Sequence, residues 1–386
     1  MLFLGGALVL VGDTIVYAGS IRILYKIIAD AVSAGTTSPN AAFLPRPALS
    51  SGMTDTRQAV LAALADGPVT GPALADRLDV SRAAVWKHVE ALRDEGFGVE
   101  STDDGYELTE IPEYGADAVA FGLDASFDVE YHDTVGSTND RARELATDGR
   151  ENVVVLAGRQ VGGRGRRDRA WESPSGGIWL SAVLRPDLPP ARAPLLTLAM
   201  AVAVTDAARE HGVDATIKWP NDVLVSNANE GTPDASSGDS LVSNANEGTS
   251  RDSGGRKLSG ILTEMEGESG RVSWVVVGVG VNANVDPGDL YEGATSLRSA
   301  AGRVDRRVFV QRVLERFDEL RADLDGVLPA WRERTNTLGR RVRVHLPDGD
   351  VVGRAVDVTE TGALVVDTGE ERRVVHAGDC EHLRPV

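Results

Sequence analysis

The chain has 386 residues and carries 58 acidic against 40 basic side chains, which gives a formal net charge of −18. This length predicts two or three domains, and 42% hydrophobic residues describe a soluble globular protein, which excludes collagen-like, disulfide-stapled and polytopic membrane proteins. The single cysteine, Cys380, excludes an intrachain disulfide and a cysteine-based zinc site, and predicts a cytoplasmic location. Only four basic residues are lysines, and this arginine preference with an acidic excess is typical of a salt-adapted protein.

Residues 1–52 are predicted to be a leader, either a start-site extension or a disordered segment. They are rich in apolar residues, but Asp13, Arg22 and Lys26 interrupt every run before it reaches the roughly 20 residues that span a bilayer. The first 11 residues contain no basic side chain, unlike a signal peptide. We therefore expect no membrane anchor, and we expect Met53, which begins a charged helix-forming run, to be the working start.

Residues 53–113 are predicted to form a winged helix-turn-helix. Apolar residues recur at helical spacing in three short stretches, 54–66, 72–78 and 81–96, and good helix-starting residues precede the last two. Two extended pieces within 98–109 flank an Asp-Asp-Gly turn and are expected to form a hairpin. An ordinary three-helix bundle is the alternative interpretation.

Residues 118–333 are predicted to form a mixed α/β domain, because strand and helix patterns alternate along them. The expected strands cover 127–131, 152–157, 178–184, 216–219, 258–266 and 272–281, and the expected helices begin at 137 and cover 195–209 and 307–324.

The α/β domain contains a tandem duplication. Residues 224–232 recur unchanged 17 residues later, at 241–249. The Ser, Asn, Gly and Asp content predicts a disordered loop over 227–255, and two copies are too few for a solenoid.

Residues 335–386 are predicted to form a small β-barrel. β-Branched residues alternate with polar ones, and turns are indicated at Asp348-Gly349 and Thr361-Gly362.

Glycine alternates with arginine in the run Gly162-Gly163-Arg164-Gly165-Arg166-Arg167, which is followed by Trp171. Free backbone N–H groups and rigid guanidinium donors suit a phosphate or carboxylate. A nucleic-acid-binding loop would look similar, but in so acidic a chain the run favours an anionic small molecule.

A second cluster, Lys218-Trp219-Pro220-Asn221-Asp222, ends an apolar strand. A carboxylate beside a carboxamide can hold Mg²⁺, which prefers oxygen ligands and shares them with phosphates. The alternative is a plain Pro-Asn-Asp turn.

Two further clusters lie on predicted strands. Lys257 stands directly before a buried strand that contains Gly260, and in a chain that avoids lysine this position indicates a need for a compact ammonium charge, although an edge lysine is the alternative. Gly278, Gly280 and Asn282 follow on the next strand, where glycines allow a ligand to approach the backbone or mark a bulge.

Ser137-Thr138-Asn139-Asp140 opens a predicted helix. One interpretation is a capping box in which Ser137 is the N-cap. The other is a helix N-terminus that grips a polar ligand, and the two are compatible.

Taken in order, Ser137–Asn139, Gln160–Arg166, Lys218–Asp222, Lys257–Ile261 and Gly278–Asn282 resemble the motifs of the biotin protein ligase family. Upstream, Ser81–Val89 and the Asp104-Gly105-Tyr106 turn resemble the winged helix of its bifunctional members, which repress biotin genes. Downstream, 331–340 resembles the passage into their SH3-like domain. The resemblance covers the chain from Met53 onward, apart from the repeated insertion.

The resemblance implies an α+β protein. Its mixed α/β catalytic domain would have the class II synthetase-like biotin/lipoate ligase fold, preceded by a winged helix-turn-helix and followed by an SH3-like β-barrel. Biotin and Mg·ATP would give biotinyl-5′-AMP, which a lysine of a biotin carboxyl carrier protein domain then attacks. The adenylate would also be the corepressor of a homodimer on operator DNA.

The resemblance also implies site residues. Lys257 and Arg166 would be catalytic, and Asp222 would hold the metal. The expected biotin-binding residues are Ser137, Thr138, Asn139, Gln160, Gly163, Arg164, Gly165, Arg166, Lys257, Gly260, Gly278 and Gly280. The expected ATP-binding residues are Arg164, Arg166, Arg167, Trp171, Asn221, Asp222 and Asn282. The expected DNA-binding residues are Ser81, Arg82, Lys87 and His88.

Two departures from the family pattern stand out. The family commonly has glycine where this chain has Asp168, and if that position needs a positive φ, aspartate tolerates it less well and its charge opposes phosphate. The insertion between Asp222 and Lys257 lengthens a short connection, which adds little closure entropy, so catalysis should survive it.

Three alternatives remain open. A lipoate ligase shares the catalytic fold but is not expected to combine these motifs with a winged helix. A biotin-binding repressor without catalysis would not need every charged site residue. A ligase without DNA-binding function is suggested by residues 53–113, which carry five basic against thirteen acidic side chains and offer few phosphate contacts.

Overall fold

The computed structural model describes residues 52–226, 255–268 and 270–383. The predicted leader and the predicted disordered insertion lie outside these ranges, apart from Gly52 and Gly255. The second copy of the duplication also lies outside them.

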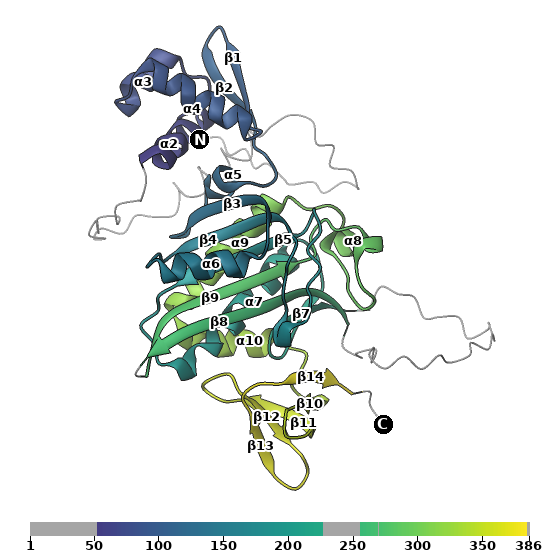
Figure 1. Ribbon diagram of the computed structural model, residues 1–386. Coiled ribbons are helices and arrows are strands. Elements are labelled where there is room, and N and C mark those ends of the chain that lie inside the picture. The colour runs from purple at the N-terminus through teal and green to yellow at the C-terminus, as the bar shows by residue number, and fades with distance from the viewer. Residues whose placement is uncertain (1–51, 227–254, 269, 384–386) are drawn as a thin grey trace, which may run out of the picture. The chain divides into compact units, whose positions relative to one another are not determined.

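The amino-terminal part is a winged helix-turn-helix, as the sequence predicts (Figure 1). Ser81 and Thr70 start two of its helices, because their hydroxyls accept from the N–H of Ala84 at 3.1 Å and of Ala73 at 3.3 Å. The hairpin, in which Ser101 pairs with Tyr106, distinguishes it from a bare three-helix bundle. Its elements are α2 (Gly52–Ala65), α3 (Gly71–Leu78), α4 (Arg82–Asp94), β1 (Gly98–Thr102) and β2 (Gly105–Glu110).

The central domain is built on a seven-stranded sheet with the order β3-β4-β5-β9-β8-β7-β6. Only β3 and β4 run parallel, and every other neighbouring pair is antiparallel. The strands are β3 (Asp128–Val135), β4 (Val153–Gln160), β5 (Ile178–Leu184), β6 (Ala215–Lys218), β7 (Asp222–Val225), β8 (Arg256–Glu268) and β9 (Arg271–Val281). The predicted strands are all present, and β7 is an additional one.

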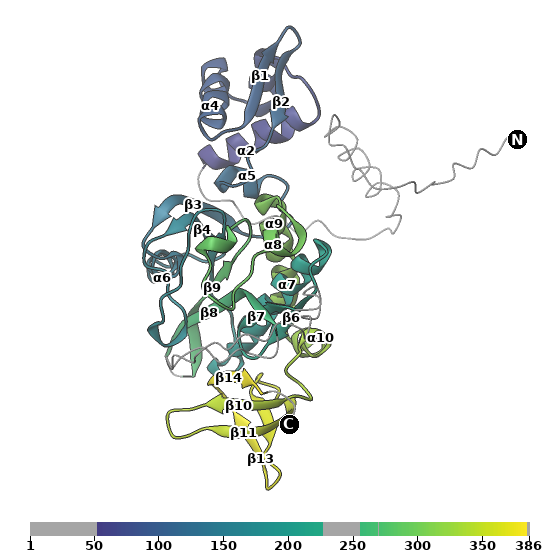
Figure 2. The same ribbon diagram turned by 90° about the vertical axis from the view of Figure 1, so that its right-hand side faces the viewer.

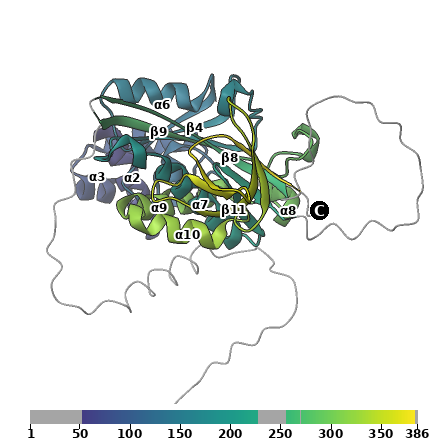
Figure 3. The ribbon, with the colours of Figure 1, turned by 90° about the horizontal axis from the view of Figure 1, so that it is seen from below.

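Helices cover both faces of this sheet (Figure 3). On one face α6 packs its small apolar side chains, such as Ala142 and Ala146, against β4, β5 and β9. On the other lie α7, α9 and α10. The helices are α5 (Ala116–Ala120), α6 (Thr138–Thr147), α7 (Pro194–Glu210), α8 (Leu297–Ala301), α9 (Arg306–Ala322) and α10 (Val327–Arg334), with single 3₁₀ turns at Arg166–Asp168, Pro190–Arg192, Pro287–Asp289 and Leu324–Gly326.

Helix α7 is the centre of the core. Twelve of its 17 residues are buried, and many of them are alanine or valine, which lets the helix approach the sheet closely. Among the described residues, the stretch Pro190–Glu210 is long and apolar enough to cross a membrane, and 72% of its apolar window is buried inside the fold.

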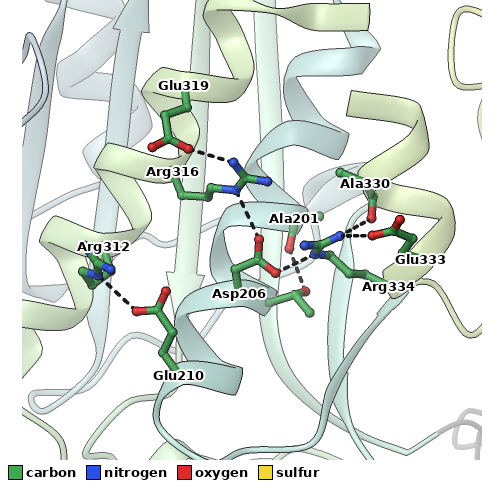
Figure 4. A network of polar contacts seen from close by, with 10 residues as sticks. Ala201, Asp206, Glu210, Arg312, Arg316, Glu319, Ala330, Glu333 and Arg334 are labelled. Carbon is green, nitrogen blue, oxygen red and sulfur yellow. Dashed lines mark hydrogen bonds and ion pairs between the residues drawn. The ribbon is translucent and has the colours of Figure 1, made fainter. Parts of the chain in front are cut away.

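Ion pairs join the exposed sides of α7, α9 and α10 (Figure 4). Asp206 of α7 accepts from Arg316 Nε at 3.2 Å and from Arg334 Nε at 2.5 Å, and Glu210 accepts from Arg312 Nε at 3.0 Å. The helical layer behind the sheet is therefore tied together by guanidinium groups.

The carboxyl-terminal part is a five-stranded antiparallel sheet with the order β13-β12-β11-β10-β14 (Figure 2), in agreement with the expected SH3-like domain. Trp219 joins it to the central domain, because its backbone N–H donates to Thr337 Oγ1 at 2.9 Å and its Nε1 donates to the Gly362 carbonyl at 3.0 Å. The strands are β10 (Arg341–His345), β11 (Val351–Val358), β12 (Leu364–Asp367), β13 (Arg372–Val375) and β14 (Asp379–His382).

Candidate active site

A pocket of about 310 Å³ lies on the α6 side of the central sheet. It is bounded by the N-terminus of α6, by β8 and β9, and by residues 161–170, which we call the ligand loop. Most of the residues that the sequence singles out line it: Ser137, Thr138, Asn139, Gln160, Arg164, Gly165, Arg166, Trp171, Asn221, Asp222, Lys257, Gly260, Gly278 and Gly280.

One end of the pocket is lined by uncharged side chains that hydrogen-bond to one another and to the residues behind them. Gln160 Oε1 accepts from the backbone N–H of Thr138 at 2.7 Å. The Gln160 carboxamide therefore satisfies an amide in the first turn of α6, which is the task of an N-cap side chain. Ser137 itself makes no side-chain capping bond, and the capping-box interpretation is wrong at that residue. The buried Ser181 Oγ donates to Asn139 Oδ1 at 2.6 Å, and Asn139 Nδ2 donates to Glu264 Oε2 at 2.9 Å.

Glycine is required where the sheet meets these side chains. A Cβ on Gly278 would lie 1.9 Å from Asn139 Oδ1, and one on Gly280 would lie 2.6 Å from Trp171 Nε1. These glycines therefore make room for the Asn139 and Trp171 side chains against the strand backbone, and the strand register shows no bulge at either glycine. The approach of a ligand to the same backbone stays a prediction.

The opposite end of the pocket is charged. Lys257 Nζ lies 2.7 Å from Asp222 Oδ1 and 4.9 Å from the centroid of the Trp171 ring. Arg166 Nη1 donates to Asn221 Oδ1 at 3.0 Å. Burial lowers the pKa of Arg166, and the carboxylates of Asp379 and Asp222 oppose that shift. The pocket lining as a whole contains four cationic side chains and two carboxylates, and this net positive charge suits an anion with developing charge.

The ligand loop is tied to elements on both sides. Arg164 Nη2 lies 2.5 Å from Asp140 Oδ1 at the start of α6. Arg167 and Arg169 both pair with Asp379 of β14, at 3.3 and 2.5 Å. Arg167 also donates to the His345 carbonyl at 2.9 Å.

The loop's left-handed residue is Arg167, at φ 55°, and not the position of the family's glycine. The strained backbone position is therefore Arg167, and Asp168 does not have the positive φ that was considered for it. Since guanidinium bonds to the carboxyl-terminal sheet hold Arg167, the surrounding contacts determine this conformation.

Three predicted ligand residues do not line the pocket. Asn282 is buried and donates to the Thr295 carbonyl at 3.0 Å, so it holds the segment before α8. Arg167 faces the carboxyl-terminal sheet. Gly163 lies outside the pocket lining, and its carbonyl accepts from the Trp171 N–H at 2.9 Å.

Five polar residues at the site were missed by the sequence analysis. Arg169, Tyr291 and Asp379 line the pocket, and Ser181 and Glu264 support Asn139. Ser181 had a usable signal, a single hydroxyl in the otherwise apolar run Ile178–Leu184. Arg169 and Glu264 stand a few residues beyond the recognised motifs, on the ligand loop and on β8. Tyr291 and Asp379 come from segments that only folding brings near.

The predicted DNA-binding residues divide into two groups. Ser81, Arg82 and Lys87 are exposed on α4, and Trp86 beside them is 55% exposed. His88 is only partly exposed, and this partial burial, aided by the charge of Arg57, lowers its pKa.

Among the described residues, no group of three or more His, Cys, Asp or Glu side chains gathers to hold a metal ion. Asp222 supplies one carboxylate next to the Asn221 carboxamide at the charged end. Such a set fits Mg²⁺, which binds through one or two carboxylates together with substrate phosphates.

Comparison with known families matches all three parts of the chain. The biotin/lipoate A/B protein ligase family model matches residues 133–282, the biotin protein ligase C terminal domain matches 337–383, and an HTH domain matches 56–107. The class is therefore a biotin or lipoate ligase with a helix-turn-helix.

Individual relatives narrow this class. The chain is 35% identical over 331 residues to the bifunctional ligase/repressor BirA of Bacillus subtilis (strain 168), which covers 81% of this chain and 93% of the relative. It is 33% identical over 263 residues to the biotin–[acetyl-CoA-carboxylase] ligase of Mycobacterium tuberculosis, covering 64% and 86%. The protein belongs to the biotin protein ligase family, in its bifunctional form. Its fold matches the biotin protein ligase of Aquifex aeolicus in complex with biotin and ATP, with a TM-score of 0.51 and 24% identity over 67% of this chain and 99% of that one.

Proposed function

We propose that the protein is an ATP-dependent biotin ligase that activates biotin to biotinyl-5′-AMP and transfers the biotinyl group to a lysine of a carrier domain. The same chain acts as a biotin-responsive repressor.

The observation that carries the ligase function is the two-ended pocket. Its neutral end presents Thr138, Asn139 and Gln160, which can hydrogen-bond an uncharged cyclic urea. Its charged end presents Lys257 and Arg166, which can receive a carboxylate and a phosphate. Biotin has a ureido ring at one end and a carboxylate at the other.

Activation brings two anions together, so the main task of the protein is to supply fixed positive charge. Lys257 neutralises the biotin carboxylate and the charge that develops on the α-phosphate. Arg166 holds the phosphate from the loop side. Asp222 keeps Lys257 in place through their ion pair, and Trp171 covers the ammonium with its ring.

When bound, Mg²⁺ neutralises the ATP phosphates, and Asp222 with Asn221 would hold it. Ser137 and the glycines Gly165, Gly260, Gly278 and Gly280 shape the wall around biotin. Trp171 Nε1 is buried and finds no hydrogen-bond acceptor among the described residues, so it is an available donor to the ligand.

The test is incorporation of labelled biotin into a biotin carrier domain with Mg·ATP and high KCl. Lys257→Ala should lower incorporation by about 100-fold or more, because it removes charge from the reacting centre. The matched control is Lys87→Ala, an exposed lysine on α4, which should stay within about twofold of the parent.

A parent protein that binds biotin but transfers none would contradict the ligase function. It would favour the non-catalytic repressor instead.

The repressor function is supported by the exposed face of α4, where Arg82 and Lys87 can contact phosphates and Ser81 and Trp86 can reach base edges. The hairpin contributes no basic side chain and carries Glu100, Asp103, Asp104, Glu107 and Glu110. Operator recognition would therefore depend on α4, in a homodimer with biotinyl-5′-AMP as corepressor.

We also propose a cytoplasmic location and adaptation to high salt. A cytoplasmic location fits Cys380, the single and buried cysteine of the chain, which can form no intrachain disulfide. Salt adaptation fits the net charge of −18 with few lysines, since an acidic surface stays soluble in strong salt.

A further inference from the structure

Asn139 of α6 rests on three neighbouring strands of the central sheet. Gly278 of β9 pairs with Ser181 of β5 on one side and with Leu262 of β8 on the other, so these three residues form one row across the sheet. A Cβ on Gly278 would lie 1.9 Å from Asn139 Oδ1, which places the Asn139 carboxamide directly over this row. Asn139, Leu262 and Gly278 all line the ligand pocket.

The partners of Asn139 fix the direction of its carboxamide. Its Nδ2 lies 2.9 Å from Glu264 Oε2 and 3.4 Å from the Leu262 carbonyl, and both of these groups are acceptors. Its Oδ1 accepts from the Ser181 hydroxyl at 2.6 Å. Because a carboxylate and a carbonyl cannot donate, the NH₂ group has to point toward β8, and both of its hydrogens have acceptors there.

The part of Asn139 that is left for a ligand is its oxygen. A carboxamide oxygen has two lone pairs, and among the described residues only the Ser181 hydroxyl donates to this one. The oxygen can therefore accept one more hydrogen bond, whereas the nitrogen has no hydrogen to offer. Such a group recognises an N–H of the ligand.

Gln160 is oriented in the opposite sense. Its Oε1 accepts from the Thr138 N–H at 2.7 Å, so its Nε2 donates to Ser173 Oγ at 2.9 Å and keeps a second hydrogen. The two carboxamides thus offer one acceptor and one donor to the same end of the pocket. A cyclic urea has N–H groups on either side of its carbonyl, which is the complementary pattern.

We infer that Glu264 is a positioning residue that makes Asn139 the acceptor for a ureido N–H of biotin. This inference rests on the proposed function, from which it takes biotin as the ligand. Glu264 lies outside the pocket lining, so it acts only through Asn139. Its charge-assisted bond to Asn139 Nδ2 also polarises the carboxamide, which makes the oxygen a stronger acceptor.

The charge of Glu264 has its own counterion away from the ligand. Arg143 Nη1 lies 3.9 Å from the second carboxylate oxygen, Oε1, and the Glu264 side chain is 28% exposed. The neutral ring of biotin therefore meets the oriented carboxamide of Asn139 and not a bare carboxylate.

The test is equilibrium binding of labelled biotin to the full chain without ATP. Glu264→Leu removes the acceptor and lets the Asn139 carboxamide turn its NH₂ group toward the ligand, so the Kd for biotin should rise at least about tenfold. Glu264→Gln keeps an oxygen that can accept from Asn139, so its Kd should stay within about threefold of the parent. The matched control is Glu266→Leu, which removes an exposed carboxylate from the same strand and should change the Kd by less than about twofold.

Competing ligands distinguish positioning from a general loss of structure. The parent should reject biotin methylated on at least one of its two ureido nitrogens, because the methyl group removes the N–H that Asn139 accepts. Glu264→Leu should lose this discrimination by about tenfold. Desthiobiotin keeps both N–H groups and lacks the sulfur, so the substitution should weaken it by the same factor as biotin.

Unchanged discrimination against both methylated compounds in Glu264→Leu would overturn the inference. So would a Glu264→Gln variant that binds biotin as weakly as Glu264→Leu. A parent that shows the expected binding pattern but transfers no biotin to a carrier domain would support the inference and reject the ligase function alone. A folded parent that binds no biotin would reject both.

Discussion

The arginines of the ligand loop have different partners, although they stand almost side by side in the sequence. Arg166 faces the pocket, whereas Arg167 and Arg169 are committed to Asp379 of the carboxyl-terminal sheet. Arg164 lines the pocket but is held from α6. Three of these arginines thus hold the loop through ion pairs, which leaves Arg166 for the phosphate contact that the proposed function gives it.

Asp140 is the residue that fixes Arg164, and its removal should loosen the loop. Because both side chains are more than a third exposed, the pair contributes at most about 1 kcal/mol. Asp140→Asn should therefore speed the release of labelled biotinyl-5′-AMP from the enzyme by up to about fivefold. The measurement is the loss of bound label after a chase with unlabelled biotin.

Glu144→Gln is the control, because Glu144 also pairs with an arginine of α6 but not with the loop. Equal release rates for Asp140→Asn and the parent would show that this ion pair does not hold the loop closed.

The residues that carry charge in the site could be predicted from the sequence, and their supports could not. Lys257, Asp222 and Arg166 lie in short linear motifs, so local spacing reveals them. Glu264 and Asp379 reach the site through strand pairing and domain contact, which depend on long-range folding. Asn282 shows the reverse case, since a family motif predicts it at the ligand, whereas the structure places it outside the pocket lining with its amide bonded to Thr295.

At the level of elements, a charge cluster built around the buried Asp117 lies where the winged helix meets the central domain. Asp117 of α5 is 2% exposed and lies 3.0 Å from Arg57 of α2, and Glu95 after α4 bonds the same guanidinium. Burial, together with the neighbouring Asp117 carboxylate, raises the pKa of Glu95 to about 7, and Arg57 only partly opposes this.

This cluster makes the winged helix less stable as the pH rises. Because the pKa of Glu95 is higher in the folded state than its ordinary value of 4.5, the folded state binds the proton more tightly. The resulting stabilisation is complete below about pH 4.5 and is lost as the pH rises through 7. Glu95→Gln should remove this dependence, so its Tm should exceed that of the parent more at pH 8 than at pH 5.

Glu110→Gln, on the exposed end of the hairpin, serves as the control in the same thermal scans. Parallel pH profiles for Glu95→Gln and the parent would contradict the assignment.

The insertion between β7 and β8 joins two strands that already pair. Val225 is the Cα partner of Arg256, so the two ends lie at neighbouring positions in the sheet. Replacing residues 227–254 with an Asn-Gly turn should therefore keep biotin transfer within about twofold, because loop length alters closure entropy only slightly. The measurement is transfer by the shortened chain, and a large loss with normal folding would give the insertion a direct role in the reaction.

β7 was itself missed by the sequence analysis, whereas the long elements α7, β8 and β9 were predicted almost to their ends. β7 has four residues and begins within the turn-like Pro-Asn-Asp run, so it has no periodic pattern of its own. It exists because β8 offers a long edge on which to pair.

For the whole molecule, the net charge of −18 sets the response to salt. Repulsion among surface carboxylates disfavours the compact state, and at 1 M salt the screening length falls to about 3 Å. The Tm should therefore rise between 0.1 and about 2 M KCl, although surface arginine pairs weaken over the same range. The check is a set of thermal scans over this KCl range at pH 7 and at pH 4.5. Partial protonation of the carboxylates should make the rise of the Tm smaller at pH 4.5. An equal rise at the two pH values would point to a general solute effect.

Trp219 limits how far the carboxyl-terminal sheet can be separated from the central domain. It is 1% exposed, it belongs to the same short motif as Asp222, and its indole bonds the carboxyl-terminal sheet at Gly362. That sheet is therefore not an interchangeable module. A chain that exchanged it for another small barrel would have to keep an acceptor for the Trp219 indole, so the motif Lys218–Asp222 and the final domain constrain one another.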